Sequence, residues 1–148
     1  YRAVVVDEMH IDAAAMDLVR KPEKFDVIVT TNLFGDILSD LAAYVTGSIG
    51  LGASANIGDD KAMFEPIHGA AFDIAGKGIA NPTAMVLCTA WMFKWLGEKH
   101  GKANYVRAGI AIENAVIETL KEGRALTPDL GGSAKTDEFT EAVLQKLV

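Results

Sequence analysis

Two short apolar runs, each followed by a helical pattern, limit the possible folds more than any other feature of the sequence. Residues 3–6 read AVVV and residues 25–30 read FDVIVT, and β-branched runs of this length are typical of buried strands. Asp12 stands near the start of one helical pattern, and a second helical pattern covers residues 32–45. This order of strand, helix, strand and helix predicts an α/β fold with a parallel sheet.

The remainder of the chain predicts helices separated by turn-rich connections. Residues 46–60 are rich in Gly, Ser, Ala and Asn, so we expect a connection there and a boundary between two structural units. Further along we expect a short strand over 62–65, helices over 82–96, 105–121 and 137–147, and a turn-rich stretch over 127–133. In the last helix, the buried face should carry Phe139, Val143 and Leu147.

Composition excludes several classes of partner. The 148 residues are 50% apolar and carry a net charge of −6, with Lys and Arg scattered, which argues against nucleic acid or an anionic membrane as partner. The longest apolar run, residues 84–93, is too short to span a bilayer. The single cysteine, Cys88, cannot form an intramolecular disulfide, fits a reducing cytoplasm, and should be buried.

Three aspartates are candidate ligands for a hard metal ion. Asp36 and Asp40 are four residues apart, hence on one helix face, where like charges repel each other unless a cation lies between them. Asp12 also lies at the start of a helix that follows a predicted strand. Oxygen donors without His or Cys suit Mg²⁺ or Mn²⁺. The same spacing is common on solvated helix faces, with Asp12 as a cap, so spacing alone leaves both interpretations open.

The stretch HGAAFDIAGKGIANP, residues 68–82, places three glycines around a single acid, Asp73. It lacks the G-x-G-x-x-G fingerprint of a Rossmann turn and the G-K-S/T ending of a P-loop. Taken by itself, a glycine-rich stretch with one aspartate is most often a plain turn.

Two longer blocks resemble one enzyme family. TTNLFGDILSDLAAYVTGSIGLGASANIG and MFEPIHGAAFDIAGKGIANPTA are similar to the metal-dependent β-decarboxylating dehydrogenases, which act on isopropylmalate, isocitrate, homoisocitrate or tartrate. The tail TPDLGGSAKTDEFTEAVLQKL fits the same family, so the resemblance covers the whole chain. The segments SANIG and HGAAFDIAGKG are most similar to those of archaeal-type isopropylmalate dehydrogenases. The resemblance implies a two-domain α/β fold without a Rossmann fingerprint, of which this chain is the C-terminal part.

For the acids, the resemblance implies a Mg²⁺ or Mn²⁺ site and a homodimer or higher homo-oligomer. Asp36 is similar to the principal metal-ligating aspartate, and Asp40 lies beside it as a ligand or a neighbour of the ligands. Asp12 is similar to the aspartate that the family contributes to the partner subunit's active site. Residues 1–46 would then belong to the smaller, dimer-forming domain, and residues 47–148 to the larger nucleotide-binding domain.

For the glycine-rich stretch, the resemblance implies that it wraps the adenosine half of NAD. Asp73 would accept hydrogen bonds from the ribose hydroxyls and repel the 2′-phosphate of NADP. NADP-using relatives carry a basic residue followed by an aromatic one there, whereas this chain has Asp73-Ile74. The expected cofactor-binding residues are His68, Gly69, Ala70, Asp73, Ala80 and Asn81.

The implied function is NAD-dependent oxidative decarboxylation of a malate-type 2-hydroxy acid, with 3-isopropylmalate first and isocitrate, homoisocitrate or tartrate as alternatives. 3-Isopropylmalate would place the enzyme in leucine biosynthesis, in the cytoplasm. The family's substrate-binding arginines and its catalytic tyrosine and lysine have no counterpart here, so the metal ligands are the only catalytic groups expected. A non-catalytic nucleotide-binding fragment or subunit is the alternative of a different class.

Overall fold

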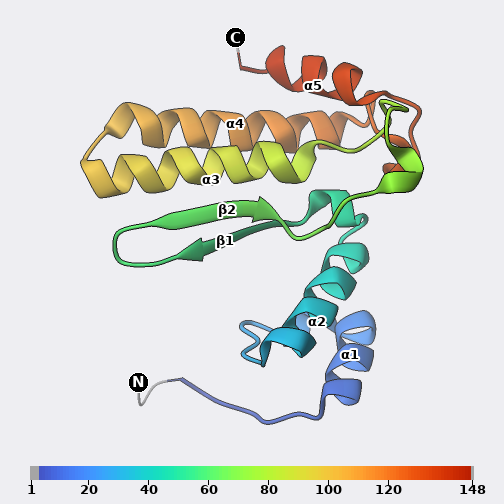
Figure 1. Cartoon of the computed structure of the whole chain (residues 1–148), viewed down its shortest axis with the longest axis vertical. Coiled ribbons are helices and arrows are strands. Elements are labelled where there is room, and N and C mark those ends of the chain that lie inside the picture. The colour runs from blue at the N-terminus through green and yellow to red at the C-terminus, as the bar shows by residue number, and fades with distance from the viewer. Residues whose placement is uncertain (1–3, 148) are drawn as a thin grey trace.

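The computed structural model describes residues 4–147, which form five α-helices and a two-stranded sheet (Figure 1). Short 3₁₀ turns connect several of them. The elements are α1 (Ile11–Arg20), η1 (Pro22–Lys24), α2 (Asn32–Val45), η2 (Ile49–Leu51), β1 (Ala53–Ile57), β2 (Ala62–Pro66), η3 (Phe72–Ile74), α3 (Thr83–His100), α4 (Ala103–Glu122), η4 (Pro128–Leu130) and α5 (Thr136–Leu144).

Helices α3 and α4 form a long antiparallel pair at the centre of the larger group of elements (Figure 1). The pair approaches closely at Gly109, where a Cβ atom would lie 2.5 Å from the backbone oxygen of Ala90. A contact that short requires glycine, because no real Cβ atom can occupy the space. Both helices were predicted; α3 extends beyond its predicted C-terminal end, and α4 extends beyond both of its predicted ends.

The principal apolar core lies between α4 and α5. Ala115 and Val116 of α4 pack with Phe139 and Val143 of α5, and each of the four is at most 4% exposed. The prediction for Phe139 and Val143 is therefore confirmed. The prediction for Leu147 was wrong: α5 ends at Leu144, and Leu147 beyond it is 40% exposed. Once the helix stops, its 3.6-residue period no longer decides which side chain faces the core.

The β-hairpin packs against α3 on the side away from α5 (Figure 1). Strands β1 and β2 are antiparallel, with Ala55 opposite Phe64, and the Phe64 ring meets Trp95 of α3 edge-on at 6.3 Å. Strand β2 was predicted, but β1 lies inside the stretch 46–60 that was expected to be only a connection. Its sequence, ASANI, has little strand propensity, so pairing with β2 decides its structure.

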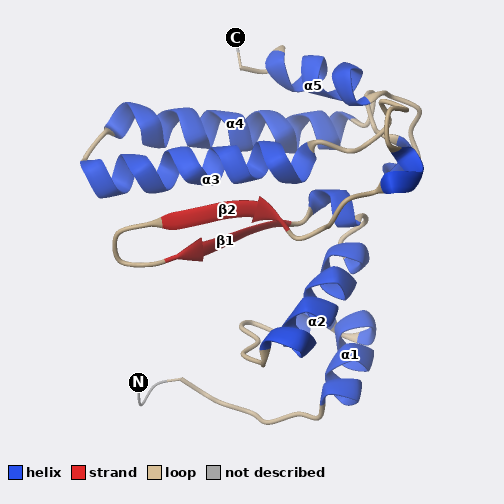
Figure 2. Cartoon of the chain, in the orientation of Figure 1, coloured by secondary structure: helices blue, strands red, loops and turns tan. Residues whose placement is uncertain are grey.

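The strands predicted over residues 3–6 and 25–30 do not form (Figure 2). Ala3 lies outside the described residues, and the rest of both runs has no regular structure. Val5 is 91% exposed and Val29 is 92% exposed. A strand needs a neighbour for its backbone hydrogen bonds, and the part of the chain described here offers these two runs none. The expected parallel sheet is accordingly absent from residues 4–147, whose only sheet is the antiparallel hairpin.

Helix α3 is apolar along much of its length, and Cys88 within it is 2% exposed, as predicted. Within residues 4–147, no helix is both long enough and apolar enough to cross a bilayer.

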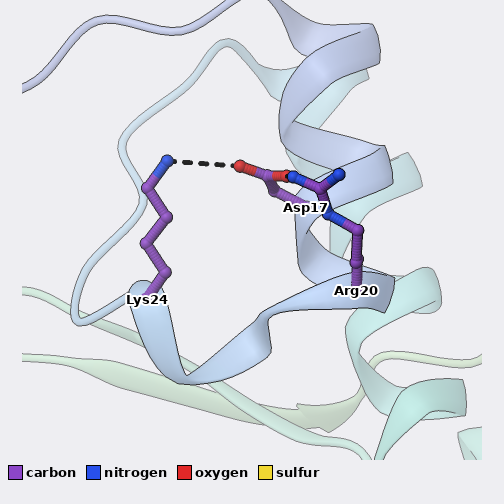
Figure 3. Close-up of polar contacts among 3 residues, drawn as sticks. All are labelled: Asp17, Arg20 and Lys24. Atoms are coloured by element: carbon purple, nitrogen blue, oxygen red, sulfur yellow. Dashed lines mark hydrogen bonds and ion pairs between the residues drawn. The ribbon is translucent and has the colours of Figure 1, made fainter.

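Helices α1 and α2 pack against each other and form the N-terminal end of the structure (Figure 1). Both were predicted, and α2 has the expected bounds. Asp17 of α1 is a buried acid whose carboxylate contacts Arg20 and Lys24, each at 3.2 Å (Figure 3). The hydrogen bond from Lys24 and the positive charge of both neighbours hold the pKa of Asp17 below its ordinary value, although burial opposes this shift. Asp17 thereby ties η1, where the chain turns away from α1, to the helix.

Replacing Asp17 with Asn should lower stability near neutral pH and have little effect in acid. A carboxyl group whose pKa falls on folding stabilises the protein above its unfolded pKa, near 3.8, and loses that contribution as the pH drops. The urea midpoints of the wild type and Asp17→Asn, followed by circular dichroism, should differ from pH 8 to about pH 5. The difference should shrink as the pH falls below 3.8 and vanish below the lower pKa of the folded state.

Asp26→Asn is the matched control, because Asp26 is exposed and takes part in none of the ion pairs found in residues 4–147. Its midpoint should follow that of the wild type at every pH. A difference for Asp17→Asn that persists unchanged to pH 3 would contradict the role given to the charge of Asp17.

Candidate functional site

The predicted metal-binding acids lie on the two N-terminal helices. Asp36 and Asp40 are both exposed on α2 and lie one helical turn apart. Asp12 is exposed in the first turn of α1, where its Oδ1 accepts a hydrogen bond from the N–H of Ala13 at 2.8 Å. None of the ion pairs found among residues 4–147 involves these three acids. Their carboxylates therefore face solvent, with no basic side chain competing for them.

The structure does not gather the three acids into one cluster. Over the described part of the chain, no group of three or more His, Cys, Asp or Glu side chains lies close enough to hold a metal ion. Asp36 and Asp40 supply two hard oxygen donors at a spacing that one cation can bridge, which fits Mg²⁺ or Mn²⁺ in chemical type. Within the described part of one chain, these acids alone do not make a complete ligand set.

The first half of the glycine-rich stretch is open to solvent. A Cβ atom added to Gly69 would meet nothing within 4 Å, and Asp73 is exposed in η3. Phe72 beside it is 88% exposed. His68 is half-buried, with its Nδ1 atom 3.1 Å from the carbonyl oxygen of Gly69. Ala70 is exposed. This half of the stretch thus exposes its backbone and the Asp73 carboxylate to solvent, where a ligand could contact them.

The second half is held by the protein itself. Gly76 and Gly78 have φ values of 75° and 65°, which favour glycine, so two of the three glycines are required by the turn itself. Thr136, the first residue of α5, then makes two contacts with this segment. Its N–H donates to the carbonyl oxygen of Gly78 at 2.9 Å, and its hydroxyl donates to the carbonyl oxygen of Ala80 at 2.6 Å.

Asn81 is held at both ends of its side-chain amide. Its Oδ1 accepts a hydrogen bond from the N–H of Thr83 at the start of α3, at 3.0 Å. Its Nδ2 donates to Oδ2 of Asp129 at 2.9 Å. The amide orientation is therefore fixed before any ligand arrives.

Asp129 is a polar residue of this region that the sequence did not single out. It lies in η4, and the oxygen that binds Asn81 also accepts a hydrogen bond from the hydroxyl of Ser48. Partial burial raises the pKa of Asp129, but these hydrogen bonds outweigh burial, so its pKa lies below the ordinary value. Ser48 follows closely after α2, so Asp129 joins the helix that carries Asp36 and Asp40 to the glycine-rich stretch.

An open hollow of about 550 Å³ is lined by the segment Gly76, Lys77 and Gly78 and by residues of α5. None of the six predicted cofactor residues lines it. Four of the predicted cofactor residues, His68, Gly69, Ala70 and Asp73, lie in the open first half of the stretch, and the other two, Ala80 and Asn81, lie in the anchored second half.

Comparison with known proteins supports the family resemblance that the sequence suggested. The family model described as isocitrate/isopropylmalate dehydrogenase matches residues 1–143. The 3-isopropylmalate dehydrogenase of Sulfurisphaera tokodaii is 54% identical over 97% of this chain and 43% of its own length. The isocitrate/homoisocitrate dehydrogenase of Thermus thermophilus is 56% identical over 97% of this chain and 41% of its own length.

A solved structure shows the same fold. The crystal structure of isocitrate dehydrogenase from Methylococcus capsulatus superposes with a TM-score of 0.90 at 47% identity, covering 99% of this chain and 42% of that chain. The chain therefore spans about two fifths of the length of the relatives it matches. Its α/β fold is of the isocitrate/isopropylmalate dehydrogenase type, and the chain belongs to the isocitrate/isopropylmalate dehydrogenase family.

Proposed function

We propose that this chain is the metal- and nucleotide-binding part of an NAD-dependent enzyme that oxidatively decarboxylates a malate-type 2-hydroxy acid, with 3-isopropylmalate as substrate. The observation that carries the proposal is a combination of two features in a chain of this family. An exposed aspartate pair lies on α2, and an open glycine-rich surface carries Asp73. One feature suits a hard cation, and the other suits a ribose with free hydroxyls.

The residues have distinct roles in this proposal. Asp36 and Asp40 would hold Mg²⁺ or Mn²⁺, and Asp12 would complete the ligand set of a second subunit. Bound metal supplies polarisation of the substrate's hydroxyl and adjacent carboxylate, and NAD supplies the hydride acceptor. Asp73 would accept hydrogen bonds from the ribose hydroxyls. His68, Gly69, Ala70, Ala80 and Asn81 would position the adenosine half.

The choice of substrate rests on the relatives' names and on the resemblance of the segments SANIG and HGAAFDIAGKG, and on no substrate-contacting residue of this chain. Relatives named 3-isopropylmalate dehydrogenase and isocitrate/homoisocitrate dehydrogenase are almost equally similar, at 54% and 56% identity. Isocitrate or homoisocitrate is therefore the second candidate, ahead of tartrate. With 3-isopropylmalate as substrate, the enzyme would act in leucine biosynthesis, which we place in the cytoplasm.

The deciding experiment is turnover by the full-length protein with NAD and Mg²⁺ or Mn²⁺. The values of kcat/KM for 3-isopropylmalate, isocitrate, homoisocitrate and tartrate should rank 3-isopropylmalate first. A higher value for isocitrate or homoisocitrate would move the assignment to the second candidate. Absence of turnover with all four, together with nucleotide binding, would favour a non-catalytic subunit.

We also propose that the working unit is at least a homodimer, formed through the N-terminal helices. Several large apolar side chains on α1 and α2 are more than half exposed: Met16, Val19, Leu33, Ile37 and Tyr44. An exposed apolar surface of this kind is typical of a protein–protein interface. Residues 1–46 would form part of the smaller, dimer-forming domain, and residues 47–148 part of the larger nucleotide-binding domain.

Metal dependence is tested with Asp36→Asn. The substitution removes one ligand charge, so kcat/KM should fall by orders of magnitude while the fold is retained. In EDTA, the variant should be as stable as the wild type or slightly more so, because it loses the repulsion from Asp40, which is worth a few tenths of a kcal/mol. Asp59→Asn, at an exposed position in the β-hairpin turn, is the matched control and should keep full activity. Full wild-type activity in excess EDTA would contradict the metal site.

The position of Asp12 is tested by mixing subunits. Asp12→Ala and Asp36→Asn homodimers should each be inactive, and a mixture of the two should regain part of the activity. In a mixed dimer, one of the two sites receives both an intact Asp36 and an intact Asp12. Activity is measured after subunit exchange has been verified by native mass spectrometry. A mixture that stays inactive after exchange would place Asp12 in its own chain's site or outside the sites.

Cofactor preference is tested at Asp73. A 2′-phosphate facing this carboxylate would cost on the order of several kcal/mol once water is excluded. At about 1.4 kcal/mol per tenfold, this cost allows a preference for NAD of about a hundredfold or more. The double variant Asp73→Lys, Ile74→Tyr should reduce or invert the ratio of kcat/KM for NAD over NADP and leave the metal requirement unchanged.

Asp59→Lys makes the same change of charge away from the glycine-rich stretch and should leave that ratio near the wild-type value. A wild type that already prefers NADP would contradict the role of Asp73. The same conclusion would follow if the control moved the ratio as far as the double variant does.

A further inference from the structure

The two halves of residues 68–82 differ in how the protein holds them. The first half contains Gly69 and Asp73, and its backbone hydrogen bonds to the protein are local ones within η3 and the following turn. The second half is tied to segments far along the chain. Ala80 and Thr136 are 56 residues apart, and Asn81 and Asp129 are 48 residues apart. One half is free to meet a ligand while the other is fixed in place.

We propose that Thr136 and Asp129 are positioning residues for the nucleotide site: they hold residues 78–81 in the orientation that binds the adenosine half of NAD. The inference rests on the proposed function, because it takes residues 68–82 to be the NAD-binding stretch. Neither residue needs to touch the cofactor. Both act on it through Ala80 and Asn81.

Thr136 controls the direction of two peptide groups. Its N–H binds the carbonyl oxygen of Gly78 at 2.9 Å and its hydroxyl binds the carbonyl oxygen of Ala80 at 2.6 Å. In a planar trans peptide, the carbonyl and the following N–H point in opposite directions. Fixing the carbonyl of Ala80 toward α5 therefore turns the N–H of Asn81 away from α5. Without the hydroxyl of Thr136, the peptide group between Ala80 and Asn81 could rotate, and the N–H of Asn81 would no longer have a fixed direction.

Asp129 fixes the side chain that follows. Its Oδ2 accepts from Nδ2 of Asn81 at 2.9 Å and from the hydroxyl of Ser48. Ser48 is 4% exposed, and its oxygen also accepts the N–H of Gly50 at 3.0 Å, so this anchor is itself rigidly held. A charged acceptor strengthens both hydrogen bonds of Asp129 relative to a neutral one. Asn81 is thereby held between Asp129 and the first turn of α3.

Thr136→Val tests the proposal, because valine keeps the shape of threonine and lacks its hydroxyl. In the full-length protein, the dissociation constant of NADH and the KM for NAD should rise about three- to tenfold, as loss of one net hydrogen bond predicts. NADH binding is measured by its fluorescence, which requires no turnover. The KM for the 2-hydroxy acid and the kcat at saturating NAD should change less than twofold.

Two threonine variants control for a purely structural effect. Thr136→Ser restores the hydroxyl and should bind NADH as the wild type does. Thr140→Val removes a hydroxyl from the same helix that donates to the carbonyl oxygen of Thr136 and to no atom of residues 68–82, and this variant too should bind NADH normally. Asp129→Asn keeps the shape but loses the charge, so it should weaken NADH binding as Thr136→Val does. If Thr136→Val fails to fold, NADH binding by Asp129→Asn tests the proposal instead.

Wild-type NADH affinity in both Thr136→Val and Asp129→Asn would overturn the proposal. So would equal losses of NADH and 2-hydroxy-acid affinity, because these would report general damage. A wild type that binds NADH but oxidises no malate-type acid would refute the proposed function and leave the positioning roles supported by the binding data. A wild type that binds no NADH would overturn both.

Discussion

The close contact between α3 and α4 is the constraint on which the arrangement of the hairpin, α5 and the glycine-rich stretch depends. At Gly109 the two helices approach until no side chain fits between them. The paired helices then offer two surfaces: α3 packs the β-hairpin, and α4 packs α5 through the core around Phe139. The glycine-rich stretch leaves the hairpin at one end and enters α3 at the other, while α5 supplies Thr136. The helix pair thereby positions α5, which anchors the stretch through Thr136, and Asp129 in η4 supplies a second anchor.

Sequence patterns predicted the helices well because a helix makes its backbone hydrogen bonds within itself. Helix α2 has the predicted bounds, and Phe139 and Val143 lie in the core as their spacing indicated. Strands depend on a neighbour that local sequence does not reveal. The β-branched residues 4–6 and 27–29 remain exposed without regular structure, whereas the small and polar residues of β1 pair with β2. Strand propensity identified segments that could form strands, but pairing with a neighbouring strand decided which segment formed one.

In the candidate site, too, the local features could be predicted from the sequence and the long-range contacts could not. The spacing of Asp36 and Asp40 and the glycines around Asp73 could be read directly, because that chemistry lies within a few consecutive residues. The anchoring network could not, because Ser48, Asn81 and Asp129 meet only in the folded chain. An acid in a turn, such as Asp129 after Thr127-Pro128, gives no sign in the sequence that its partners are a buried serine and an asparagine 48 residues away.

The hydrogen bonds among Ser48, Asp129 and Asn81 connect the proposed metal site to the proposed nucleotide site. Ser48 follows the helix that carries Asp36 and Asp40, and it binds the same carboxylate oxygen of Asp129 as Asn81 does. Two consecutive hydrogen bonds therefore link Ser48, shortly after the end of α2, to Asn81. In the proposed function, Asp36 and Asp40 and the backbone of residues 78–81 would have to keep a fixed distance from each other for hydride transfer. Asp129, a charged acceptor that Ser48 and Asn81 share, would then help to keep that distance with few atoms.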